Sequence, residues 1–369
     1  MFKSAVLIFC GALFLVAGCT TVPQEPLPTD WAGTNRPVPV PEKPPVRNPP
    51  PMTPTNVPPP RPAPSPVTNR APSPVAPVFT WTSLNRWAAE QKISPPRLLS
   101  KSPLTTYALQ SPRGTLVLAL GSREISWNGV VLHLGFAPEF IDDQLFVHGL
   151  DLQKNLMPLL LGPALAVGAN RVVVLDPGHG GVNGGTVSVV DRRPEKEFTL
   201  DWARRMKPLL EANGWKVFLT RTEDFDLALS NRVTFAEAHH ADLFISLHFN
   251  SVAPDQRPAG LATFCLTPAG MPSTVTRGYP DILTQSFPNN AFDVANLQFA
   301  ERLHRALLRA SGMEDRGVNR ARFMGVLRGQ NRPAVLLEAG FLSNPHEAKR
   351  IADPQFRQQL AEAVADVLK

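Results

Sequence analysis

Apolar positions between residues 79 and 161 come in short runs separated by turn sequences. Four runs fit short strands: Thr105–Gln110, Thr115–Leu120, Glu124–Trp127 and Val130–Gly135. The last two are separated by Asn128-Gly129, a strong signal for a tight hairpin. Thr82 or Ser83 is placed to cap a short helix that starts at Leu84. The pattern therefore predicts a small α+β domain over residues 79–168.

From residue 170 the pattern changes to apolar runs that alternate with segments of helical period. The apolar runs predict buried strands: Arg171–Leu175, Lys216–Thr220, Leu243–Leu247, Leu261–Leu266 and Ala334–Leu337. Helices are predicted over Phe198–Ala212, which ends at the cap signal Asn213-Gly214, over Val294–Ala310 and from Pro354 on. This order of strands and helices predicts an α/β domain over residues 169–369, with a mostly parallel sheet and helices on both faces.

The amino end reads as an export signal over residues 1–18. Lys3 precedes an apolar run, Ala5–Ala17, that is too short to anchor a protein across a bilayer. The run ends in Val-Ala-Gly followed by Cys19, which resembles a bacterial lipobox. That resemblance implies that Cys19 is lipidated and attaches the mature chain to a membrane. Thr20 rather than Asp follows the cysteine, which points to the outer membrane of the cell envelope.

Residues 19–78 form a proline-rich linker, and the chain has 40 prolines in all. Runs such as Pro58-Pro59-Pro60 favour extended polyproline II, so we expect a tether; a docking site for a proline-binding partner is the alternative. The net charge of +6 is spread along the chain without a basic run containing aromatics, so we expect no nucleic-acid partner. Three cysteines exclude a disulfide scaffold.

Polar residues of the types that bind metals lie next to the predicted strands of the second domain. His179 follows Val-Val-Val-Leu-Asp-Pro-Gly, His248 and Glu338 end two other strands, and Glu195 lies where a helix begins. The carboxyl ends of parallel strands form the ligand crevice of an α/β sheet. Two histidines and a carboxylate suit a catalytic divalent metal, commonly zinc, and a spare carboxylate suits a proton acceptor. Each histidine alone also has a structural interpretation, as a packed or capping residue.

The motifs then resemble those of a known family. Val-Val-Leu-Asp-Pro-Gly-His-Gly-Gly, Glu-Lys-Glu-Phe-Thr-Leu, Ala-Asp-Leu-Phe-Ile-Ser-Leu-His-Phe-Asn and Leu-Leu-Glu-Ala-Gly-Phe-Leu-Ser-Asn-Pro occur in order. They are similar to motifs of the zinc-dependent N-acetylmuramoyl-L-alanine amidases of the AmiC/CwlC type. The resemblance implies one Zn²⁺ bound by His179, Glu195 and His248, with Glu338 as catalytic base. It also implies cleavage of the amide between N-acetylmuramic acid and L-alanine of peptidoglycan by zinc-activated water.

Several neighbouring residues receive other interpretations. Glu197 is a rival third ligand, although the family pattern favours Glu195. Asp176 is expected to fix the turn or a ligand, Arg232 to form an internal ion pair, and Cys265 to be a core residue. The segment 79–168 loosely resembles the small domain at the amino end of copper amine oxidases, without implying copper chemistry.

One departure from the family's compact members is a long connection from Pro268 to Asp293. Some Gram-negative members of the family carry there a helix that blocks the site until a protein activator binds. The prolines and glycine of this connection disfavour one long helix, so we expect a substrate-groove loop, with Asn250 and Asn296 as groove residues. A requirement for an activator stays open.

Three functions remain in competition. The first is a lipid-anchored, periplasmic peptidoglycan amidase for wall turnover or daughter-cell separation. The second is a zinc carboxypeptidase that acts on the stem peptide, since its metal chemistry is alike. The third is a non-catalytic wall-binding protein, which predicts loss of a site residue; all four are present.

Overall fold

The computed structural model describes residues 80–162 and 168–369. Cys19, the signal segment 1–18 and the proline-rich linker 19–78 lie outside the described residues. Among the residues that are described, no helix has both the length and the apolar composition needed to cross a membrane.

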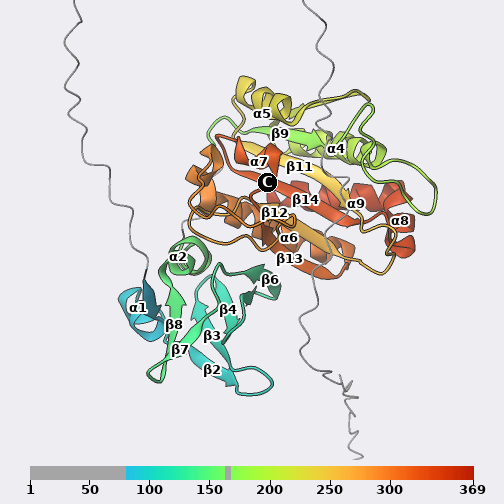
Figure 1. Cartoon of the computed structure of the whole chain (residues 1–369). Coiled ribbons are helices and arrows are strands. Elements are labelled where there is room, and N and C mark those ends of the chain that lie inside the picture. The colour runs from blue at the N-terminus through green and yellow to red at the C-terminus, as the bar shows by residue number, and fades with distance from the viewer. Residues whose placement is uncertain (1–79, 163–167) are drawn as a thin grey trace, which may run out of the picture.

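The carboxy-terminal half is built on buried strands with helices on both faces (Figure 1). Its strands are β9 (Val172–Pro177), β10 (Lys216–Leu219), β11 (Leu243–Asn250), β12 (Leu261–Cys265), β13 (Asp315–Arg320) and β14 (Ala334–Phe341). Neighbours run in the order β10-β9-β11-β14-β12-β13, and all pairs are parallel except β12 with β14. The predicted mostly parallel α/β sheet is thus confirmed. Strand β13 was missed because its sequence, Asp-Arg-Gly-Val-Asn-Arg, has no apolar run.

Helices cover the two faces of this sheet unequally. One face carries α4 (Glu195–Ala212), α6 (Asp293–Ser311), α8 (Pro345–Ala352) and α9 (Pro354–Val367). The other carries α5 (Leu229–Ala238) and the short α7 (Gly325–Arg328), whose apolar residues pack on Phe244 and Leu336. Helix α4 ends at Asn213 and Gly214, the latter with φ +84°, as the cap signal predicts.

The amino-terminal half contains a meander and a smaller sheet. The meander is β2 (Arg97–Ser100), β3 (Thr106–Ser111), β4 (Gly114–Ala119), β5 (Glu124–Trp127) and β6 (Val130–His133). The second sheet joins β1 (Trp81–Ser83), β7 (Glu139–Ile141) and β8 (Gln144–His148). Helix α1 (Leu84–Glu90) buries Leu84, Trp87 and Ala88, but Ser83 at its N-cap makes no capping hydrogen bond. Its hydroxyl donates instead to Gln144.

A helical segment leads from the small sheet towards the second half of the chain. It consists of α2 (Gly149–Asp151), the π-helical turn η2 (Leu152–Leu156) and α3 (Met157–Leu160). Both η2 and α3 contact α6, so the segment from α2 to α3 packs against the carboxy-terminal half. In that half, the 3₁₀ turn η3 (Pro288–Phe292) precedes α6.

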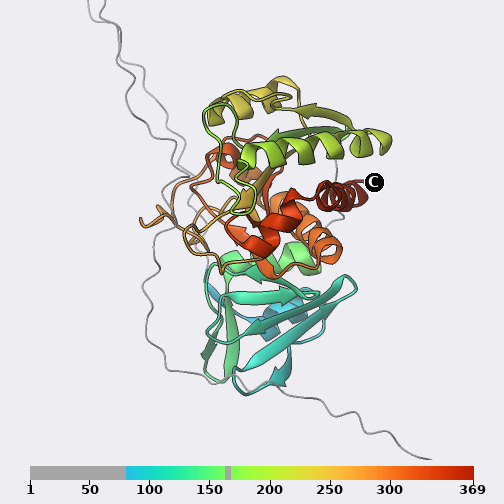
Figure 2. The same cartoon turned by 90° about the vertical axis from the view of Figure 1, so that its right-hand side faces the viewer.

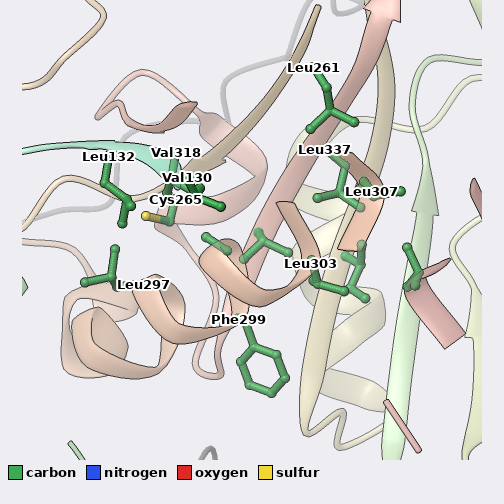
Figure 3. Packing of buried hydrophobic residues seen from close by; sticks show 14 of the residues in the cluster. Val130, Leu132, Leu261, Cys265, Leu297, Phe299, Leu303, Leu307, Val318 and Leu337 are labelled. Atoms are coloured by element: carbon green, nitrogen blue, oxygen red, sulfur yellow. The ribbon is translucent and has the colours of Figure 1, made fainter. Parts of the chain in front are cut away.

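The two halves share one sheet. Strand β6 pairs with β13 through Leu132 and Val318, so that in the described residues an 11-stranded sheet runs from β10 to β2. Figure 2 shows the meander directly below the carboxy-terminal half. Figure 3 shows Val130 and Leu132 of β6 beside Val318, Cys265 and Leu297, in a single hydrophobic core. Cys265 is a buried core residue, as expected.

Candidate active site

Three neighbouring strands direct polar side chains to one face of the sheet. His248 on β11 lies in register with Glu338 on β14, and Ser246 lies in register with Asp176 on β9. Alternate residues of a strand point the same way, so Ser246 shares the face of His248. These strands are parallel, and their carboxyl ends therefore meet at one edge.

Two histidines and one glutamate converge at this edge. His179 lies in the turn after β9, and Glu195 is the first residue of α4. The Nε2 atom of His179 lies 3.0 Å from Oε2 of Glu195, and Nδ1 of His248 lies 2.9 Å from Oε1 of the same carboxylate. One ligand atom from each residue lies within 4.8 Å of the others, so the three form a group able to hold a metal ion. The sequence had singled out the same three residues.

The members of this group shift one another's pKa values. Burial alone would raise the pKa of Glu195, but the charge and hydrogen bond of His179, with the hydrogen bond from His248, hold it well below its usual range. Burial lowers the pKa of His248, which favours the neutral imidazole. For His179 the burial effect is outweighed by the Glu195 carboxylate, so its pKa rises. A buried carboxylate between two imidazoles is a donor set that suits zinc.

Glu338 lies on the same face but makes no such contact. It is 2% exposed, and its Oε2 atom has no hydrogen-bond partner among the described residues. Burial, and then the negative charge of Glu195, raise the pKa of Glu338 well above its usual value. Buried carboxylate oxygens are normally hydrogen-bonded, so an unsatisfied one at this edge points to chemistry rather than to stability.

Glycines make room for the two imidazoles. A Cβ atom at Gly178 would lie 2.2 Å from Cε1 of His248, and one at Gly185 would lie 2.6 Å from Oε2 of Glu195. Gly185 also has φ +70°, which disfavours any other residue. His179 itself has φ +62°, a conformation uncommon outside glycine. The glycine-rich sequence around His179 is therefore a packing requirement of the site.

Asp176 and Arg232 support the turn that carries His179. The Asp176 carboxylate accepts hydrogen bonds from Thr220 (2.6 Å), Arg232 (2.6 Å) and Ser246 (2.7 Å). Arg232 also donates to the carbonyl oxygens of Pro177 (2.9 Å) and His179 (2.8 Å). Both residues are buried, and they position the backbone that carries His179. Arg232 thus forms the expected internal ion pair, and Asp176 fixes the turn.

Asn183 was missed by the sequence analysis. Its Oδ1 atom lies 2.9 Å from Nδ1 of His179, so a donated proton on Nδ1 leaves Nε2 for the metal group. The only signal in the sequence is a polar residue four positions after His179, within a glycine-rich turn.

Glu197 is separated from the site. Its side chain is 47% exposed and pairs with Arg193 at 2.8 Å, whereas the Glu195 side chain is 2% exposed. The helical turn at the start of α4 points the two carboxylates in different directions. The geometry favours Glu195 as the third member of the group.

A cavity of about 620 Å³ opens beside the two histidines. Leu227, Leu229 and Val326 line its apolar part, and Arg277 and Arg328 line another part. Arg277 belongs to the long connection from Pro268 to Asp293, which contains no helix before α6 apart from the 3₁₀ turn η3. The connection therefore contributes to the cavity wall.

The two asparagines predicted to lie in the groove are placed elsewhere. Asn296 is fully buried; its amide binds Asn289 (2.9 Å) and the Ala334 N–H (2.8 Å), so its prediction is wrong. Because its side chain is buried among these partners, Asn296 is not accessible to a substrate. Asn250 is half-buried, accepts from the Ser251 N–H at 2.7 Å and is not among the residues that line the cavity.

Known proteins are similar to the carboxy-terminal half of this chain. The family described as N-acetylmuramoyl-L-alanine amidase matches residues 173–369. The chain is 31% identical to N-acetylmuramoyl-L-alanine amidase AmiC of Escherichia coli O6:H1, over 59% of this chain and 58% of that protein. It is also 31% identical to AmiC of Neisseria meningitidis serogroup B, over 63% of this chain and 65% of that protein. The matched part thus spans less than two thirds of the length of either relative.

A solved structure is also similar. The catalytic domain of CwlV, an N-acetylmuramoyl-L-alanine amidase from Bacillus (Paenibacillus) polymyxa var. colistinus, is 31% identical. The match covers 54% of this chain and 96% of that one, with a TM-score of 0.44. Since the family match covers more than half of the chain, this protein belongs to the N-acetylmuramoyl-L-alanine amidase family.

Proposed function

We propose that the chain is a zinc-dependent hydrolase that cleaves the amide between N-acetylmuramic acid and L-alanine in peptidoglycan. The observation that carries this proposal is the grouping of His179, Glu195 and His248 within 4.8 Å, beside the buried Glu338 with an unsatisfied oxygen. Family membership supports the choice of bond.

The residues fit a bound metal. Two imidazoles and one carboxylate are a common donor set for catalytic zinc, and their burial beside a cavity leaves access from one side. Bound there, the metal supplies a Lewis acid that polarises the scissile carbonyl and lowers the pKa of water. Asn183 and Arg232 orient His179 through its ring and its carbonyl.

Glu338 is the group that handles the proton. A buried carboxylate with a raised pKa accepts a proton from attacking water and passes it to the leaving amine of L-alanine. The apolar residues Leu227, Leu229 and Val326 line the cavity and suit the small alanyl and lactyl methyl groups.

Three variants test this mechanism in the full-length protein. We expect Glu338→Gln to keep the metal but to lower kcat at least 100-fold, as loss of general acid–base catalysis does. Glu195→Gln should lose metal, whereas Glu197→Gln, the exposed neighbour, should bind it normally. Metal content by mass spectrometry and products released from purified peptidoglycan are the measurements.

The products also separate the competing functions. Intact stem peptides support the amidase, and a free terminal amino acid would show a carboxypeptidase instead. Metal binding with no product at all would favour the wall-binding function. The same result would also arise if the enzyme needs a protein activator. Full activity of Glu338→Gln would refute the assigned base.

We further propose that residues 1–18 are a lipoprotein signal and that lipidated Cys19 anchors the chain in the outer membrane, facing the periplasm. The linker 19–78 then spaces the folded parts 79–168 and 169–369 from that membrane. The lipobox-like sequence before Cys19 supports this arrangement. Cys19→Ser should abolish incorporation of labelled palmitate and release the protein from the membrane fraction; unchanged fractionation would argue against the anchor.

A further inference from the structure

A second, smaller hollow adjoins the cavity beside the metal group. Its volume is about 100 Å³, and its lining includes Tyr279, Ile282 and Gln285 of the long connection. Phe323 and Arg328 line both this hollow and the cavity of about 620 Å³. A molecule bound at the metal group can therefore extend along the connection.

The side chains that the connection exposes here are uncharged, and three of them are large and apolar. Tyr279 is 57% exposed, Ile282 is 64% exposed and Leu283 is 40% exposed. Every exposed residue between positions 278 and 286 is uncharged, and the one aspartate of the stretch, Asp281, pairs with Arg322 at 2.8 Å. Large apolar side chains that gather on a protein surface mark binding sites. The composition of this surface favours an uncharged partner.

Hydrogen bonds hold the backbone that carries these side chains. The carboxylate of Asp281 accepts from the Ser273 N–H at 2.6 Å as well as from Arg322. The carbonyl oxygen of Leu283 accepts from the Gly270 N–H at 2.7 Å. A loop that is already ordered loses less conformational entropy when a ligand binds to it. Tyr279 and Ile282, which we call the ledge, are therefore presented on a preorganised backbone.

We propose that the ledge is a subsite for the sugar chain of peptidoglycan. This inference rests on the proposed function, in which the scissile amide joins a sugar residue to a peptide.

A substrate held at the metal group extends in two directions from that amide. Its peptide carries ionised groups, whereas the lactyl carboxyl of the sugar is consumed in the amide, so the sugar chain is uncharged. One face of a sugar ring consists of C–H groups, which pack on an aromatic ring, and its edge carries hydroxyl groups. Tyr279 supplies an apolar ring with a polar tip, and Thr276 and Gln285 line the same hollow with hydrogen-bonding groups. The uncharged ledge therefore fits the sugar chain better than the peptide.

Binding of glycan strands from which the stem peptides have been removed tests the subsite. We expect calorimetry with the full-length protein to show that Tyr279→Ala weakens this binding about tenfold, as truncation of an aromatic anchor does. Tyr279→Phe keeps the ring and should retain most of the affinity. Phe140→Ala removes an aromatic ring of β7 that is 47% exposed, and this matched control should bind as the wild type does. Thermal unfolding of Tyr279→Ala should be unchanged, because the ring is exposed.

The same strands separate this inference from the proposed function, because they contain no scissile amide and need no turnover. Binding that Tyr279→Ala weakens supports the subsite even if the protein cleaves no bond. On intact peptidoglycan, Tyr279→Ala should also raise KM about tenfold and leave kcat unchanged, since the ledge does not contact the reacting atoms.

Three results would overturn the subsite even if the protein is an active amidase. The first is a wild type that does not bind the strands, and the second is equal binding by the wild type and Tyr279→Ala. The third is a dimer that Tyr279→Ala dissociates while glycan binding stays the same, which would assign the ledge to a second copy of the chain.

Discussion

Asn183 is the residue that holds the ring of His179 in place. Its Oδ1 atom lies 2.9 Å from Nδ1 of His179 and also accepts from the Gly185 N–H at 3.2 Å. Outer partners of metal-binding histidines orient the ring and fix which nitrogen carries the proton. Asn183 is itself exposed and stabilises little of the core, so its removal should act on the metal site more than on the fold.

At the residue scale we predict that Asn183→Ala weakens metal binding. The loss should be about 10–100-fold, which is typical when such an outer partner is removed. Competition with a chelator measures the affinity, and thermal unfolding of the metal-free protein should hardly change. Asn183→Asp keeps an acceptor at the same position and is the matched control. Unaltered affinity of Asn183→Ala would show that the ring needs no such support.

Among the elements, the connection between β12 and α6 depends on side chains from both halves of the chain. Arg322 donates to the carbonyl oxygens of Pro268 and Met271, each at 2.7 Å. Arg123, in the turn before β5, donates to those of Pro272 (3.1 Å) and Ser273 (3.2 Å). A Cβ atom at Gly135 would lie 2.6 Å from Cε of Met271, so the backbone of the amino-terminal half also packs closely against this loop. The amino-terminal half thereby shapes the cavity wall that carries Arg277.

At the element scale we predict that Arg123→Ala loosens this loop. Its two hydrogen bonds to the loop, of about 1 kcal/mol each, are lost, so backbone amides of residues 270–283 should exchange with solvent roughly 10–100 times faster. Hydrogen exchange followed by mass spectrometry is the measurement, and KM should rise while metal content stays the same. Arg97→Ala, an exposed arginine of β2, is the control. Unchanged exchange in this segment would mean that Arg322 alone holds the loop.

On the scale of the whole molecule, the two halves form one sheet and one core. The Asp315 carboxylate accepts from the Val131 N–H at 2.9 Å across the junction. Lys154 pairs with Asp293 at 3.0 Å, and Arg320 donates to Asn155 at 2.8 Å. Polar contacts that surround a continuous apolar core favour cooperative unfolding of both halves together.

We predict that a cavity in β6 destabilises the carboxy-terminal half as well. Leu132 is 2% exposed, and Leu132→Ala should lower the free energy of unfolding by about 2–5 kcal/mol. Native-state hydrogen exchange should then show reduced protection in both β5 and β14. Leu98→Ala on β2, where the leucine is 41% exposed, is the matched control. Reduced protection in the small domain alone would show that the halves unfold separately.

Local patterns in the sequence were sufficient for most elements and for the candidate residues that the fold brings together. Apolar runs and hairpin signals placed β3, β4, β5 and β6 within a residue or two, because strand period and turn chemistry are local properties. His179, Glu195, His248 and Glu338 stood out because ligand-type residues directly follow apolar strands or begin a helix. Motifs shared with the family reinforced this choice.

Only the tertiary structure decided which distant groups meet. The pairing of β6 with β13, the support of His179 by Asn183 and the burial of Asn296 depend on packing between segments far apart in the chain. A sequence lists charges and apolar residues, but neutralisation and burial are properties of neighbours in space. For this protein the sequence by itself therefore determined which residue types gather at the candidate site, and the fold determined their surroundings.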